Sequence, residues 1–86
     1  MENIKEKFDK AVKEVELLKD RPSNDTLLQL YSLFKQATEG DNQHNPPENQ
    51  FDFVAKAKYE AWASLKGKSS EEAMVMYTEL VEKLST

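Results

Sequence analysis

The 86-residue sequence contains no cysteine, which excludes disulfide bonds, thiolate metal sites and cysteine nucleophiles. It contains one histidine, His44, and a lone histidine without a second ligand is poor support for a metal site. No stretch approaches the ~20 apolar residues of a membrane-spanning helix, and residues 1–5 have no apolar core of a signal peptide. We therefore expect one cytoplasmic domain over residues 1–86, without metal and without membrane insertion.

The chain is also short of positive charge, with a formal net charge of −4. A nucleic-acid-binding domain is usually basic, so we expect no nucleic-acid partner. An anionic ligand could still bind at a local cluster of lysines. Apolar residues make up 38% and charged residues 33% of the sequence, a balance that favours a folded helical domain over disorder.

The sequence has few breaks, and apolar residues recur between them at spacings of three and four, as in amphipathic helices. Pro22 should end the first segment, and Ser23 can cap the second. Gly40 fits the position after a helix C-terminus, and Ser69 and Glu72 have the spacing of a capping box. The polar, proline-containing residues 40–50 should form a loop. We predict an all-α four-helix bundle, with helices at about residues 3–19, 24–39, 52–66 and 70–84.

A lysine interrupts the apolar stripe of the third segment. At 100° per residue, Lys58 falls in the same arc as Val54, Ala61 and Trp62. Its four-carbon stem could simply pack on apolar neighbours while the ammonium reaches water. Alternatively, the ammonium could meet an anion at one end of a ligand groove. The helical pattern leaves these two interpretations about equally supported.

Three further residues permit a structural or a binding role. Tyr31 and Lys35 lie one turn apart at the edge of the second stripe, next to Phe34, either as ordinary boundary residues or as partners of a ligand with a π-surface and phosphates. Tyr77 lies at the centre of the fourth stripe, where a buried phenol needs a hydrogen-bond partner. That partner could be a protein acceptor or a ligand oxygen. No residue set singles out a catalytic site.

Residues 22–40 read PSNDTLLQLYSLFKQATEG, and this stretch resembles the signature of the acyl-CoA-binding protein family. Residues 51–53, 56–58, 61–62 and 65–67 resemble the family's third helix and its last turn, and residues 72–74 with Tyr77 resemble the fourth helix. The resemblance covers about residues 4–84. It implies a bundle of four helices with a bowl-like binding site.

The resemblance further implies a monomeric, non-catalytic carrier of medium- to long-chain fatty acyl-CoA esters, with no cofactor. Its ligand contacts would be Tyr31, Ser32, Leu33, Phe34, Lys35, Lys58 and Tyr77. The alternative is a helical protein-interaction module without a small ligand, which should expose a large apolar patch.

This sequence departs from the family pattern at four positions. Phe34 replaces a frequent tyrosine and Tyr59 a frequent tryptophan, while Glu16 and Val54 stand where many members have lysine. Phe34 lacks a hydroxyl that could bond phosphate, and the two lost lysines remove possible contacts. The departures predict a lower ligand affinity or a shifted preference for chain length.

Overall fold

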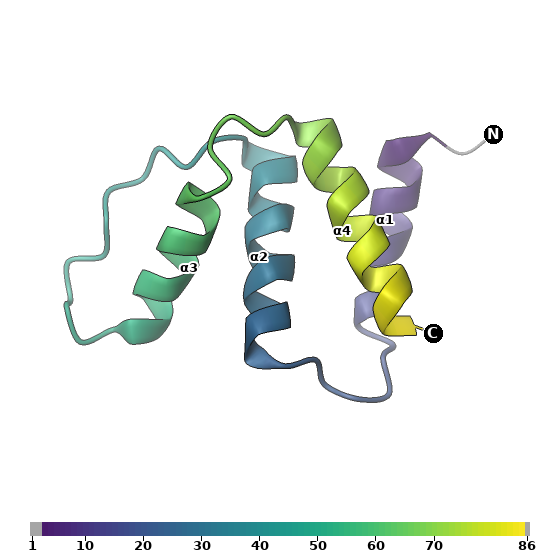
Figure 1. Ribbon diagram of the computed structural model, residues 1–86, viewed down its shortest axis with the longest axis horizontal. Coiled ribbons are helices and arrows are strands. Elements are labelled where there is room, and N and C mark those ends of the chain that lie inside the picture. Colours follow the sequence, from purple (N-terminus) through teal and green to yellow (C-terminus); the bar gives the residue numbers. More distant parts are fainter. Residues whose placement is uncertain (1–2, 86) are drawn as a thin grey trace.

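The computed structural model describes residues 3–85 and consists of four helices in that range (Figure 1). They are α1 (Ile4–Val15), α2 (Asn24–Glu39), α3 (Phe53–Ala63) and α4 (Ser70–Ser85). The described residues contain no strand. The all-α, four-helix prediction is confirmed.

The four helices are arranged in a row rather than around a single axis. α4 packs against both α1 and α2, whereas α3, within the described chain, packs against α2 only. α1 and α4 run in one direction and α2 and α3 in the other (Figure 1). The Cα atoms extend over 44 × 29 × 15 Å, with a radius of gyration of 13.4 Å. A compact domain of this length has a radius near 12 Å, so the row of helices is more extended than a compact bundle.

Side chains cap the N-termini of the helices, and two of these caps were predicted. Ser23 Oγ accepts a hydrogen bond from the Thr26 backbone N–H at 3.2 Å. Ser69 Oγ accepts one from the Glu72 N–H at 3.0 Å, and the Ser69 hydroxyl donates to the Glu72 carboxylate at 3.3 Å. These bonds satisfy N–H groups that have no partner within their own helix.

Two helices end earlier than predicted. α1 ends at Val15 instead of residue 19, because the Leu17 and Leu18 N–H groups bond to carbonyls three residues back, at Glu14 and Val15. α3 ends at Ala63 instead of residue 66 for the same reason. Such i→i−3 bonds tighten the chain into a turn at a helix end. α2 has the predicted bounds, and Gly40 follows it with φ of +81°.

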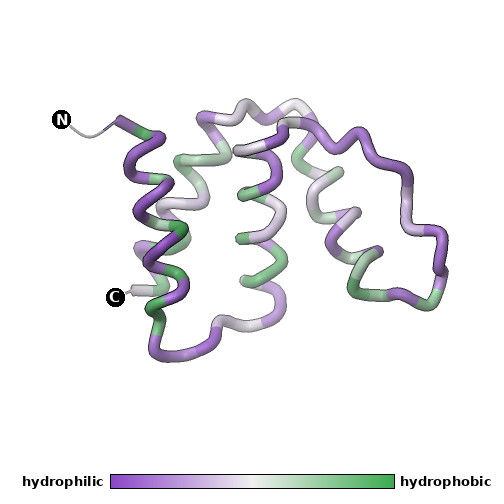
Figure 2. Tube along the Cα trace, turned by 180° about the vertical axis from the view of Figure 1, so that it is seen from behind, coloured by the Kyte–Doolittle hydropathy of each residue, from purple (hydrophilic) through white to green (hydrophobic). Residues whose placement is uncertain are grey.

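The core lies between α1, α2 and α4. Apolar and polar residues alternate along the helical traces, and the α2–α3 connection is mostly hydrophilic (Figure 2). Of α3, only Trp62 is buried. Val54, which belongs to the apolar stripe of α3, is 65% exposed because α3 packs against α2 only. The buried core cluster consists of Phe8, Ala11, Leu30, Leu33, Ala37, Ala73, Tyr77 and Val81.

A polar cluster at the end of α2 joins the α2–α3 connection to the α3–α4 connection. The Gln36 amide, fully buried, donates to Asp41 Oδ1 and to the Lys68 carbonyl oxygen, both at 2.8 Å. Asp41 Oδ1 also accepts the Gly67 N–H at 2.9 Å. These bonds to Gly67 and Gln36 lower the pKa of Asp41, with a smaller contribution from the charge of Lys66. The cluster fixes where the α2–α3 connection starts.

Candidate functional site

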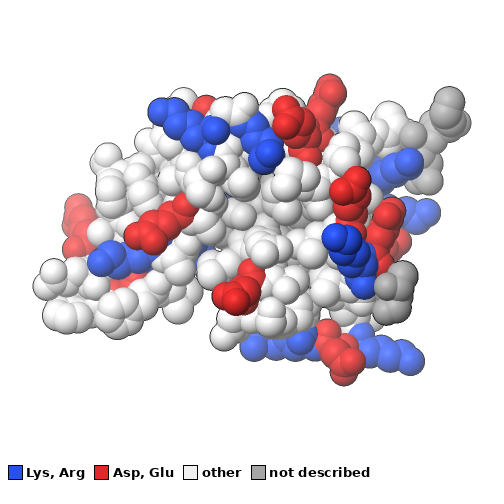
Figure 3. All heavy atoms as spheres, in the orientation of Figure 1, with Lys and Arg blue, Asp and Glu red and all other residues white. Residues whose placement is uncertain are grey.

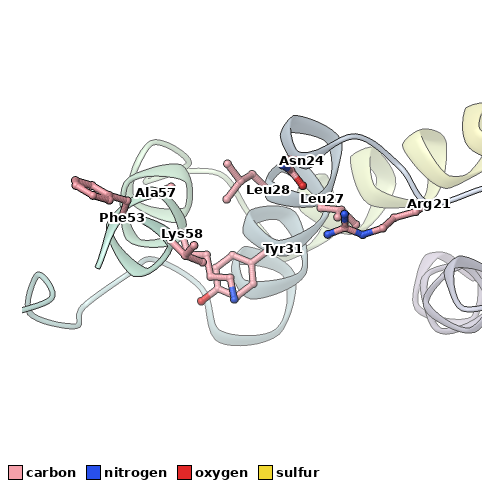
Figure 4. Close-up of a pocket in the computed structure, with 9 residues that line it drawn as sticks. Arg21, Asn24, Leu27, Leu28, Tyr31, Phe53, Ala57 and Lys58 are labelled. Carbon is pink, nitrogen blue, oxygen red and sulfur yellow. The ribbon is translucent and has the colours of Figure 1, made fainter. Parts of the chain in front are cut away.

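An apolar hollow with a volume of about 610 Å³ lies between α2 and α3. This volume is within the range of small-molecule sites, about 300–1,000 Å³. α2 contributes its first two turns and α3 its first two turns, while the α1–α2 connection closes one end (Figure 4). The hollow is lined by Arg21, Asn24, Leu27, Leu28, Tyr31, Phe53, Val54, Ala57 and Lys58.

Tyr31 is the point where two lysines from different helices converge. The Lys35 ammonium lies 5.9 Å from the Tyr31 ring centroid, one turn further along α2. The Lys58 ammonium, reaching across from α3, lies 5.2 Å from the same centroid (Figure 4). Both distances are within cation–π range. The family resemblance implied a shared site for Tyr31, Lys35 and Lys58, and the structure brings these three residues together.

The two ammonium groups differ in their partners. Lys35 Nζ donates to Glu39 Oε2 at 2.7 Å, and this hydrogen bond raises the pKa of Lys35 and lowers that of Glu39. Lys35 also lies 5.5 Å from the ring of the buried Trp62. Lys58 is exposed, and no carboxylate of residues 3–85 forms an ion pair with it. Lys58 is thus the ammonium more readily offered to an anion.

A second, smaller hollow of about 230 Å³ adjoins the first, because Tyr31 and Lys58 line both. The α2–α3 connection forms its outer wall and is tied to α3 by two hydrogen bonds. Trp62 Nε1 donates to the Gly40 carbonyl at 2.8 Å, and Asn42 Nδ2 donates to the Tyr59 carbonyl at 3.3 Å. The remaining lining residues are His44, Pro47 and Ala55.

The arrangement suits an amphiphile with an anionic head. Basic and acidic side chains are scattered over the face in Figure 3 rather than gathered into one basic patch. Positive charge near the hollow comes from Lys35 and Lys58 beside Tyr31 and from Arg21 in the α1–α2 connection, and the hollow offers the apolar surface of Leu27, Leu28 and Val54. The described residues hold no cluster of carboxylates and histidines that could bind a metal, and none of their helices is long and apolar enough to cross a membrane.

The other predicted contact residues lie elsewhere on α2 and α4. Ser32 is buried and donates to the Gln29 carbonyl at 3.0 Å, and Leu33 belongs to the core. Phe34 stacks on Phe8 with ring centroids 5.9 Å apart. A ligand role for these residues stays a prediction.

Tyr77 is 5% exposed and meets Phe8 edge-to-face, with ring centroids 5.1 Å apart. The hydrogen bonds among residues 3–85 include none from its hydroxyl. Burial raises the pKa of Tyr77, and the nearby charge of Glu16 raises it further. The phenol thus stays protonated as a possible donor, and its contact with a ligand also stays a prediction.

Sequence reasoning missed several residues that line the two hollows. Arg21, Asn24 and Leu28 lie at one end, and Asn42 and Pro47 at the other. Leu28 carried a weak signal, because it is an apolar residue beside the stripe of Leu27 and Tyr31. The connection residues carried none, because a loop has no periodicity that fixes which side chains turn inward.

Comparison with known proteins shows which family this chain belongs to. The model of the family described as "Acyl CoA binding protein" matches residues 5–81. The acyl-CoA-binding protein homolog of Drosophila melanogaster is 49% identical over 81 residues, covering 94% of this chain and 93% of the fly protein. Acyl-CoA-binding protein homolog 1 of Caenorhabditis elegans is 49% identical over 77 residues, covering 90% and 88%. The chain belongs to the acyl-CoA-binding protein family.

The fold agrees with a solved structure of that family. The crystal structure of Oryza sativa Acyl-CoA-Binding Protein 2 superposes with a TM-score of 0.88 at 36% identity, covering 95% of this chain and 90% of the rice protein. The resemblance inferred from residues 22–40 is therefore confirmed, for the family and for the fold.

Proposed function

We propose that this protein binds medium- to long-chain fatty acyl esters of coenzyme A and carries them in the cytoplasm as a monomer, without catalysis. The observation that supports this most strongly is the convergence of Lys35 and Lys58 on one tyrosine ring beside an apolar hollow. Coenzyme A supplies phosphates and an adenine ring, and the acyl group supplies the apolar chain. Family membership points to the same ligand class.

The head group is held by charge and stacking. Lys35 and Lys58 can each donate a charge-assisted hydrogen bond to phosphate, worth about 1.5–3 kcal/mol. Tyr31 offers a ring face to the adenine and a hydroxyl to a phosphate oxygen. Both lysines and the ring come from helices, so the cost of ordering on binding falls mainly on the two lysine side chains, at about 0.5–1.5 kcal/mol each.

The acyl chain is held by burial. Leu27, Leu28 and Val54 provide apolar walls, and each buried methylene contributes about 0.8 kcal/mol before ordering costs. Affinity should therefore rise with chain length until the hollow is filled. Val54, at a position where many family members have lysine, extends the apolar wall of the hollow instead of adding a cation.

The alternative of a pure protein-interaction module rests on exposed apolar residues. Leu17, Phe51, Phe53 and Val54 are 80%, 74%, 72% and 65% exposed. Phe53 and Val54 line the hollow, so an apolar ligand accounts for two of these four residues without a protein partner.

Calorimetric titration with palmitoyl-CoA, free coenzyme A and palmitate tests the proposal. The ester should bind most tightly, because it alone engages both the lysines and the apolar walls. Equal binding of all three compounds, or no binding of the ester, would contradict the carrier function. Chromatography of the recovered ester should find the thioester intact, and hydrolysis dependent on the protein would overturn the non-catalytic assignment.

A further inference from the structure

Glu39 already forms an ion pair with the Lys35 ammonium, which the proposed ligand needs. Its Oε2 accepts the hydrogen bond from Lys35 Nζ at 2.7 Å, and its Oε1 lies 3.8 Å from His44 Nε2. The carboxylate thus lies between a lysine on its own helix and a histidine in the α2–α3 connection. An anionic ligand that reaches Lys35 must displace this internal carboxylate or share the lysine with it.

Lys35 lines neither hollow, but its ammonium lies beside two aromatic rings that do. It lies near both the Tyr31 and Trp62 rings, at 5.9 and 5.5 Å. Its side chain is 30% exposed and that of Glu39 is 43% exposed. An ion pair this accessible is weak, because water and salt screen it. A phosphate dianion with several acceptor oxygens can therefore take Lys35 from Glu39, although at some loss of affinity.

His44 is placed to change the strength of that pair. Its ring is tilted over Trp62 with centroids 5.4 Å apart, and it lines the smaller hollow with Tyr31 and Lys58. Histidine is the side chain that ordinarily gains a proton between pH 8 and pH 5. The His44 side chain is 68% exposed and lies on the Oε1 side, whereas Lys35 bonds Oε2, so a protonated His44 would weaken the hold on Lys35 by turning the carboxylate toward itself. The titratable groups facing this set are Tyr31 on α2 and, across the smaller hollow, Lys58 and Tyr59 on α3.

We propose that Glu39 limits the affinity of this site for anionic head groups by holding Lys35, and that a proton on His44 draws Glu39 away and frees the lysine. The inference rests on the proposed function, since it concerns the same site. It assigns affinity-setting roles to two residues outside the seven predicted contacts. Glu39 and His44 act through Lys35 and are positioning residues.

The test compares Glu39→Gln with Glu60→Gln in calorimetric titrations with palmitoyl-CoA at pH 7.5. Glu60 is an exposed carboxylate on α3 that lines neither hollow, so its substitution changes the net charge equally. Glu39→Gln should lower Kd about two- to fivefold, the range that an exposed ion pair supports, and Glu60→Gln should leave Kd near that of the wild type. Equal or weaker binding by Glu39→Gln would overturn the role of Glu39.

The role of His44 is tested by comparing the Kd of His44→Asn with the Kd of the wild type at two pH values. The phosphate monoester of the ligand itself titrates near pH 6, so Kd of His44→Asn is divided by Kd of the wild type at pH 7.5 and at pH 5.5. The ratio should rise about twofold on acidification, and it should stay constant when both proteins also carry Glu39→Gln. A constant ratio with Glu39 present, or a rise that persists without Glu39, would overturn the coupling.

Failure of this inference is distinguishable from failure of the proposed function. If the wild-type chain does not bind palmitoyl-CoA, the carrier function itself is wrong. If the wild type binds and the variants match it, the site is an acyl-CoA site but Glu39 does not limit its affinity. Thermal unfolding of each variant shows whether a lost affinity comes from lost structure.

Discussion

Replacing Lys58 with alanine should weaken binding of palmitoyl-CoA about tenfold while leaving the free energy of unfolding almost unchanged. A hydrogen bond from an ammonium to phosphate is worth about 1.5–3 kcal/mol, which corresponds to about 10- to 150-fold in Kd. Lys58 is exposed, so water competes for its ammonium and the lower end of that range applies. Because the side chain is outside the core, truncation should change stability by less than about 0.5 kcal/mol.

Calorimetric titration gives the two dissociation constants, and urea unfolding gives the two stabilities. Lys56→Ala is the matched control, because Lys56 is on the same helix, carries the same charge and lines neither hollow. Its Kd should stay within about twofold of the wild type. Lys58→Arg should retain part of the affinity, since arginine keeps the charge and also bonds phosphate. If the two alanine variants bind equally well, Lys58 does not contact the ligand and the structural interpretation of its position is sufficient.

Two further predictions concern the polar cluster at the end of α2. Gln36→Ala should destabilise the fold by about 2–4 kcal/mol in urea unfolding, because it leaves a cavity and removes both hydrogen bonds of a buried amide. Gln29→Ala is the control, because Gln29 is exposed on the same helix. An equal loss of stability in the two variants would contradict the role of Gln36. The lowered pKa of Asp41 means that its contribution to stability is present above about pH 4, the range of an unfolded aspartate, and is lost as pH falls through its folded pKa. The stability advantage of the wild type over Asp41→Asn should therefore shrink on acidification below pH 4, and an advantage independent of pH would refute the assignment.

The best-predicted parts of the fold are those determined by local chemistry. α2 begins after Ser23 and ends before Gly40 as predicted, because a side-chain cap and a positive φ mark its two ends. α1 and α3 were predicted too long. Their apolar spacing continues past Val15 and Ala63, but spacing does not report the change from i→i−4 to i→i−3 hydrogen bonds.

The site was predicted only in part, because helical periodicity reports spacing along one helix and not the packing between segments. Helical periodicity places Tyr31 and Lys35 on one margin and marks Lys58 as unusual, and these residues do converge. Periodicity cannot say what covers a helical face, so the exposure of Val54 was missed. Gln36 was missed as well, because its bond to the Lys68 carbonyl joins positions 32 residues apart. The Glu39–His44 contact likewise depends on the path of a loop.

The proposed function requires one amphiphile to bridge the two lysines and the apolar hollow between α2 and α3. A crystal structure of the chain with bound palmitoyl-CoA tests this requirement. We expect phosphate oxygens within hydrogen-bond distance of Lys35 Nζ and Lys58 Nζ, and the acyl chain against Leu27, Leu28 and Val54. An acyl chain bound instead in the separate hollow beside Leu17 and Leu84, with both ammonium groups free of phosphate, would exclude the α2–α3 hollow as the ligand site.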